Sequence, residues 1–112
     1  GAKTMTQVAV PVVIPVSTLG ALSLVRMPFY LGMMLIKVSG SLRAITSGNF
    51  QIDVRVSGVL VATINMTSAG LTDATVDATP VSGTDIVTLD SSGIAVGALD
   101  AYVTLWFLQQ AT

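Results

Sequence analysis

The fold class is indicated most clearly by one stretch of the sequence, Phe50-Gln51-Ile52-Asp53-Val54-Arg55-Val56-Ser57-Gly58-Val59. Apolar and polar residues alternate strictly up to Val56, the period of a strand with one face on a core. Ser57-Gly58 then leads into a second extended run over 59–66, and a two-residue link ending in glycine supplies the positive φ of a tight hairpin turn. We therefore expect a β-hairpin whose first strand directs four side chains into the core: Phe50, Ile52, Val54 and Val56.

Further short extended runs lie on both sides of this hairpin, separated by turn-forming residues. Their pattern predicts strands over 21–25, 33–39, 74–79, 86–89 and 101–108, with a break over 26–29 and a brief extension at 94–96. Turns are expected at 46–49 and 90–93, and a long loop over 67–85 carries the 74–79 run as an edge strand. These reversals, about every eight to twelve residues and without helical periodicity, predict an all-β chain. The expected architecture is a single antiparallel β-sandwich, with jelly-roll and immunoglobulin-like topologies both left open.

Two of these strands carry more specific expectations. In 33–39 the apolar face is expected to hold Met34, Ile36 and Val38, with Lys37 and Ser39 opposite. In 101–108 both faces are apolar enough to be covered, which predicts a central strand or one covered by another subunit.

The N-terminal segment has a different composition, with Pro11 and Pro15 inside a run of valines. Extended backbone places five apolar residues on one face, Val8, Val10, Val12, Ile14 and Val16. Because proline cannot donate to a ladder, such a strand belongs at a sheet edge or on a neighbouring surface. We therefore divide the chain into an extended arm or edge strand (1–20) and a sandwich (21–112), and we assign the five apolar residues to a subunit interface.

Residues 4–25 are uncharged and, by length alone, reach the ~20 residues of a membrane span. The two prolines, several polar residues and many β-branched residues favour extended backbone over a membrane helix. A secretory signal is equally weak, since no basic start with a small-residue cleavage site is present. We expect no membrane partner.

The composition argues against most catalytic and cofactor chemistry. The chain has no His, no Cys and no Glu, so the commonest general base, thiol chemistry and the usual zinc ligands are missing. The five basic residues are scattered singly, which disfavours nucleic acid. With 52% hydrophobic and 10% charged residues, the surface has little charge to keep the protein monomeric, so we expect a homo-oligomer. Because of the missing residue types, we expect that the protein is not an enzyme and holds no cofactor.

Two groups of residues remain as candidates for ligand contact. Tyr102 and Trp106 share one strand face and are suited to stacking on a sugar, although core or interface packing is the favoured role. The C-terminal half offers carboxylates for Ca²⁺ or for paired-acid chemistry, but no Asp-x-Asp-x-Asp loop is present, and turn formation is favoured for Asp73, Asp77, Asp85, Asp90 and Asp100.

Three segments carry a resemblance to a known class of proteins: Leu35-Ile36-Lys37-Val38-Ser39-Gly40-Ser41-Leu42, the hairpin region from Ser47 to Val59, and Ala101-Tyr102-Val103-Thr104-Leu105. With these segments the block from Met34 to Phe107 resembles small bacteriophage virion β-sandwich proteins, found as capsid decoration (cement) proteins and tail-fibre jelly-roll modules. The resemblance implies a virion location, many copies, and a major capsid protein or other virion subunit as partner.

Two functions of different classes follow. The first is a non-enzymatic decoration protein that stabilises the phage head through subunit contacts, with the segment from Val8 to Val16 reaching a neighbour. The second is a tail-fibre or adhesin module that binds host surface glycan through Tyr102, Trp106 or loop residues between Thr67 and Asp85.

Overall fold

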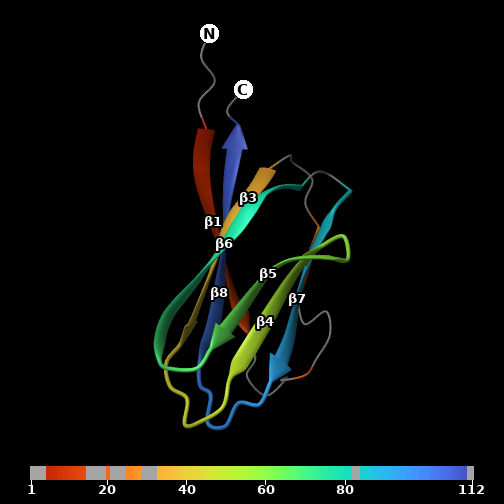
Figure 1. The fold of residues 1–112 in the computed structure, drawn as a ribbon. Helices are drawn as coiled ribbons and strands as arrows, with labels where there is room; N and C mark the ends of the chain where they lie inside the picture. Colours follow the sequence, from red (N-terminus) through yellow and green to blue (C-terminus); the bar gives the residue numbers. More distant parts are fainter. Residues whose placement is uncertain (1–4, 15–19, 21–24, 29–32, 82–83, 111–112) are drawn as a thin grey trace.

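The computed structural model describes residues 5–14, 20, 25–28, 33–81 and 84–110. These residues form eight strands and contain no helix: β1 (Met5–Ile14), β2 (Val25–Pro28), β3 (Met33–Leu42), β4 (Phe50–Val56), β5 (Val59–Met66), β6 (Gly70–Val81), β7 (Ile86–Gly93) and β8 (Ala101–Gln110). Two four-stranded antiparallel sheets pack face to face, so the expected all-β sandwich is confirmed (Figure 1). We call the sheet with order β1-β8-β3-β6 sheet A and that with order β2-β7-β4-β5 sheet B.

The strand order favours one of the two topologies that the sequence left open. An immunoglobulin-like sandwich pairs its first two strands in one sheet, whereas here β1 pairs with β8, and β2 lies in the other sheet. Consecutive strands lie in different sheets throughout, except at the β4–β5 hairpin. The order therefore agrees with the jelly-roll alternative, a double-sheet fold of eight strands.

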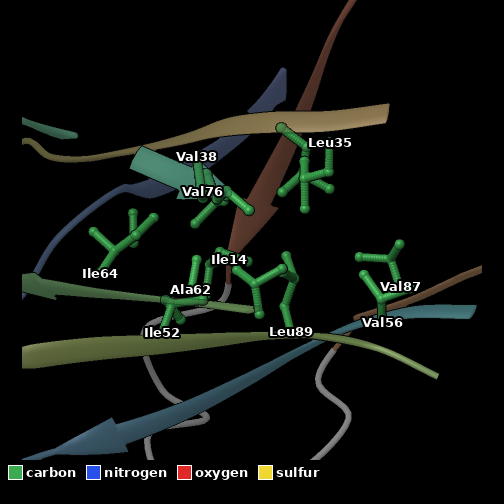
Figure 2. Packing of buried hydrophobic residues seen from close by; sticks show 14 of the residues in the cluster. Ile14, Leu35, Val38, Ile52, Val56, Ala62, Ile64, Val76, Val87 and Leu89 are labelled. Atoms are coloured by element: carbon green, nitrogen blue, oxygen red, sulfur yellow. The ribbon is translucent and has the colours of Figure 1, made fainter. Parts of the chain in front are cut away.

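The core lies between the inner faces of the two sheets. The side chains of Phe50, Ile52 and Val54 are completely buried and Val56 is nearly so, as the alternation predicts. Figure 2 shows Val38 and Val76 of sheet A opposite Ile52 and Ala62 of sheet B. Val103, Leu105 and Phe107 of β8 complete the core, and β8 is a central strand, as expected.

The hairpin after β4 has the conformation that its sequence requires. Ser57 and Gly58 have φ values of 47° and 84°, so both turn residues lie in the left-handed region, the geometry of a turn that matches the twist of the two strands. The Ser57 hydroxyl donates to a carboxylate oxygen of Asp85 at 2.8 Å, which ties the turn to the residue before β7.

The expected face of β3 is wrong at two residues. A register shift between Leu35 and Lys37 changes the alternation within the strand. Leu35 and Val38 are buried, whereas Met34 and Ile36, which we expected beside Val38, are only partly buried. A β-bulge adds one residue to a strand and so exchanges the faces on either side of it.

Two segments predicted as loop or turn are strand instead. β6 runs from Gly70 to Val81 at the edge of sheet A, where we expected a long loop with a shorter edge strand. β7 continues through Asp90-Ser91-Ser92-Gly93, which we expected to be a turn, and Asp90 and Ser91 are buried there. Polar residues that favour turns are accepted in these strands because neighbouring strands supply hydrogen bonds and counter-charges.

The short strand that we expected at 21–25 is also placed differently. The strand is β2, Val25–Pro28, and it pairs with β7 at the edge of sheet B, although we expected the strand to be broken over 26–29. The position of Pro28 agrees with the rule that proline occurs on edge strands. Residues 21–24 lie outside the described residues.

In the N-terminal segment, Met5–Ile14 form an edge strand of sheet A. β1 pairs with β8 without interruption from Met5↔Gln110 to Ile14↔Ala101. The division of the chain at residue 20 stays a prediction. In the part of the chain that the structure describes, no helix is long and apolar enough to cross a membrane.

Candidate functional site

The outer face of sheet A, which we call the A face, carries side chains from four strands. They are Gln7, Ala9, Pro11 and Val13 of β1; Tyr102, Thr104, Trp106 and Leu108 of β8; Lys37, Ser39 and Ser41 of β3; and Leu71 and Asp73 of β6. Because residues in register share a face, these side chains form rows across the sheet. The row Val13–Tyr102–Ser41–Leu71 exposes three large apolar side chains, at 67%, 45% and 70% for Val13, Tyr102 and Leu71.

Trp106 is held in the middle of the A face. Its indole N–H donates to the hydroxyl oxygen of Ser39 at 3.1 Å, and the Lys37 ammonium lies 5.6 Å from the centre of its ring. Lys37 also pairs with Asp73 at 3.6 Å. These contacts hold the ring on its own sheet, while Tyr102 stands exposed in the row at the end of the face.

The outer face of sheet B, the B face, is mainly polar and hydrogen-bonded within itself, with Leu60, the register partner of Arg55, exposed near the hairpin. Asp53 and Asp90 are register partners on adjacent strands, and Arg55 forms ion pairs with both. Gln51 and Thr63 donate to the same Asp53 oxygen, at 3.2 and 3.0 Å. Like charges directly opposite each other destabilise a sheet, and the positive charge of Arg55 offsets this repulsion between the two carboxylates.

A hollow of about 400 Å³ lies beside Arg55 and Asp90, near the β4–β5 hairpin. Hydroxyl groups of Ser57, Thr84 and Thr88 are among its lining. Both charged groups in it are already engaged in the ion pair that stabilises the sheet.

A third surface lies at the end of the sandwich, where the segments 43–49 and 94–100 run side by side (Figure 1). The Val96 N–H donates to the carbonyl of Ser47 at 2.9 Å, and the Leu99 N–H donates to that of Ala44 at 2.9 Å. Gly48 permits this close approach, since a Cβ there would lie 1.5 Å from the Ile94 carbonyl oxygen. We call the paired segments the end ladder.

In the 94–100 segment of the end ladder, large residues face outward and small residues inward, whereas Ile45 of the 43–49 segment packs against the core. Ile94, Val96 and Leu99 are 77%, 56% and 42% exposed, whereas Ala95 and Ala98 pack against the core. Arg43 and Asp100 form an ion pair with each other. The sequence predicted only a brief extension at 94–96 and no site there. The signal was the alternation of large and small apolar residues, which does not tell the inner face from the outer.

The residues assigned to an interface in β1 point toward their own core. Ile14 is 2% exposed, and Val10 and Val12 pack against the core cluster, while Val8 is partly buried. Val16 lies outside the described residues. The interface role of this set stays a prediction, but the side of β1 that is open to a neighbour carries Ala9, Pro11 and Val13.

Most of the candidate carboxylates are engaged with other side chains. Asp73, Asp90 and Asp100 pair with Lys37, Arg55 and Arg43, and Asp85 accepts a hydrogen bond from Ser57. The side chain of Asp77 lies outside the described part. Among the described residues, no three potential metal-ligating side chains come together.

Comparison with known proteins gives a likeness of fold. No family model and no curated protein matches the sequence. A chain in the acidic stable capsid structure of Helicobacter pylori bacteriophage KHP30 matches with a TM-score of 0.56 and 11% identity, covering 99% of this chain and 98% of that one. The carbohydrate-binding module CBM36, solved with calcium and xylotriose, matches with a TM-score of 0.40 and 18% identity over 78% of this chain and 70% of the module. The KHP30 match shows that the two chains share a fold.

Proposed function

We propose that this chain is a non-enzymatic structural subunit of a bacteriophage particle, and specifically a decoration (cement) protein bound to the head. The fold supports the proposal, because double-sheet jelly rolls are used in viral capsids. The likeness to a KHP30 capsid chain extends over almost the whole of both chains, so it includes the complete sandwich.

The observation that carries the proposal is the composition of the A face. Its described charged side chains are Lys37 and Asp73, which pair with each other, and the rest of the face is uncharged, with apolar side chains on β1, β8 and β6. The central part of a protein interface is depleted of charge and enriched in aromatic residues, and the A face presents Tyr102 and Trp106. We therefore assign the capsid contact to the A face and the solvent side of the bound protein to the B face.

The non-enzymatic part rests on the residues themselves. Nucleophilic and acid–base catalysis need a positioned base, and the sequence holds neither His nor Glu. The carboxylates of Asp53 and Asp90 are bound to Arg55 within a sheet, where they stabilise the fold.

The test is a binding assay with particles that lack this protein, using Thr104→Arg. Thr104 is a partly buried outward residue of the central strand β8, in register with Pro11 and Ser39. An arginine there enters the contact without a partner, and an uncompensated buried charge costs about 3–5 kcal/mol, so binding should weaken at least ~100-fold. Deleting β1 is a poorer test, because it also removes Ile14 from the core.

The matched control is Thr63→Arg on the B face. Thr63 is an exposed outward residue of β5, next to Asp53. It should bind particles like the unmodified protein. Binding that survives Thr104→Arg and is lost with Thr63→Arg would reverse the assignment of the faces, and no binding by the unmodified protein would refute the decoration role.

The glycan-binding alternative depends on the same face. Tyr102 is exposed, but the Trp106 ring is already contacted by Lys37 and its N–H is used by Ser39. Glycan-array binding that is lost in a folded Trp106→Ala variant would favour the adhesin over the decoration protein.

A further inference from the structure

The end ladder has a pattern that its own fold does not explain. In an ordinary surface strand the large apolar residues turn inward, because burying one stabilises the fold by about 1.5–3 kcal/mol. Here Ala95 and Ala98 turn inward, and Ile94, Val96 and Leu99 turn into solvent. The ladder is held in place by backbone hydrogen bonds that do not depend on these three side chains.

We propose that the end ladder is a contact between two copies of this chain, in which the stripe Ile94–Val96–Leu99 of one copy packs against the same stripe of another. This inference deepens the proposed function, since a decoration protein is present in many copies. It concerns a different surface from the A face, so it can be tested independently of capsid binding.

The charge at this end favours a second copy as the occupant. The nearest described charged groups are Arg43 and Asp100, which neutralise each other within one chain. A two-fold contact brings the same patch together from both sides, so it must be complementary to itself. An uncharged apolar stripe meets this condition, and with a net charge of -1 the copies repel each other little.

The area sets the strength of the contact. If a whole apolar side chain has a surface of about 100 Å², the exposed fractions of Ile94, Val96 and Leu99 correspond to an exposed apolar area on the order of 200 Å². A standard interface buries about 800 Å² on each partner, a little more than half of it apolar. The stripe supplies about half of that apolar area, so we expect a weak pair in free solution, strengthened where the particle holds copies side by side.

The absence of cysteine from the chain gives a clean test. In a two-fold contact, Val96 in the middle of the stripe lies next to Val96 of the second copy. Val96→Cys should therefore form disulfide-linked dimers under mild oxidation of the concentrated, purified protein. The control is Leu60→Cys at the β4–β5 hairpin, because Leu60 is 52% exposed and Val96 is 56% exposed. We expect cross-linking at Val96 to be several times faster than at Leu60.

A second variant separates contact from thiol reactivity. Adding Ile94→Ser and Leu99→Ser to Val96→Cys removes the apolar flanks and should lower the rate to that of Leu60→Cys. Equal rates for the two single-cysteine proteins, or a rate at Val96 that the serine substitutions leave unchanged, would overturn the two-fold contact. Because no particle is present, failure here is distinguishable from failure of capsid binding.

Discussion

The two sheets have four strands each, but their outer faces present different kinds of side chain to solvent. On the B face, Arg55 neutralises Asp53 and Asp90, and Gln51 and Thr63 complete the hydrogen bonds. On the A face, large apolar side chains stand exposed in the row Val13–Tyr102–Ser41–Leu71, and nothing in the chain covers them among the described residues. One face meets solvent mainly with polar groups that pair internally, and the other leaves a row of large apolar side chains exposed.

The largest effect that we expect tests whether β1 belongs to sheet A or is a detachable arm. Ile14 and Val13 are neighbours that point in opposite directions, with exposures of 2% and 67%. Ile14→Ala should lower the free energy of unfolding by about 2–5 kcal/mol, because it leaves a cavity in the core. Val13→Ala should change it by less than ~0.5 kcal/mol. Urea denaturation measures both, and a small loss for Ile14→Ala would mean that β1 does not contribute to the core.

The same reasoning shows how far the sequence could predict the fold. The alternation from Phe50 to Val56 and the Ser57-Gly58 turn predicted β4, its inner face and the hairpin correctly, because one buried face and one turn type determine them locally. Asp90-Ser91-Ser92-Gly93 was mistaken for a turn. Asp90 is stabilised within the strand by Arg55, 35 residues away, which lies beside it on β4.

The candidate site was harder to predict than the fold. Tyr102 and Trp106 were expected on one face of their strand, since strand alternation is enough for that, but the sequence did not tell that this is the outer face of sheet A. The bulge between Leu35 and Lys37 moved Met34 and Ile36 off the face of Val38, because an extra residue leaves no mark in the hydrophobic pattern. The outward direction of Ile94 and Leu99 depends on pairing with 43–49, which local sequence does not reveal.

The second prediction compares the cations of the two faces. Arg55 pairs with Asp90, whose side chain is 10% exposed, whereas the Lys37–Asp73 pair is 43% and 47% exposed. Arg55→Ala removes the positive charge that lies between two opposed carboxylates and should cost about 1–3 kcal/mol of stability. Lys37→Ala should cost no more than ~1 kcal/mol. Equal losses in urea denaturation would show that the two faces do not differ in internal pairing.

The third prediction concerns how Trp106 is held on the A face. Trp106→Phe keeps a ring but removes the N–H that bonds to Ser39, which is 6% exposed, so we expect a loss of about 1 kcal/mol. Ser39→Ala should cost about as much, and the double variant little more than either single variant, because both changes remove one interaction. Additive losses would mean that the hydrogen bond does not anchor the ring.

The smallest expected effect is that of salt on particle binding, and it decides which face makes the contact. Raising the ionic strength from about 0.1 to 1 M shortens the screening length from about 10 to 3 Å, which weakens attraction between exposed charges and leaves apolar burial intact. The A face has one internally paired Lys37–Asp73 couple, so affinity for particles should change less than ~3-fold, as measured by co-sedimentation. A contact through the B face would involve Asp53, Arg55 and Asp90, and its affinity should fall with salt. If the affinity for particles is nearly independent of salt and Thr104→Arg causes the expected loss of binding, the A face makes the contact. Both results are needed, because neither alone separates an apolar contact from a neutral polar one.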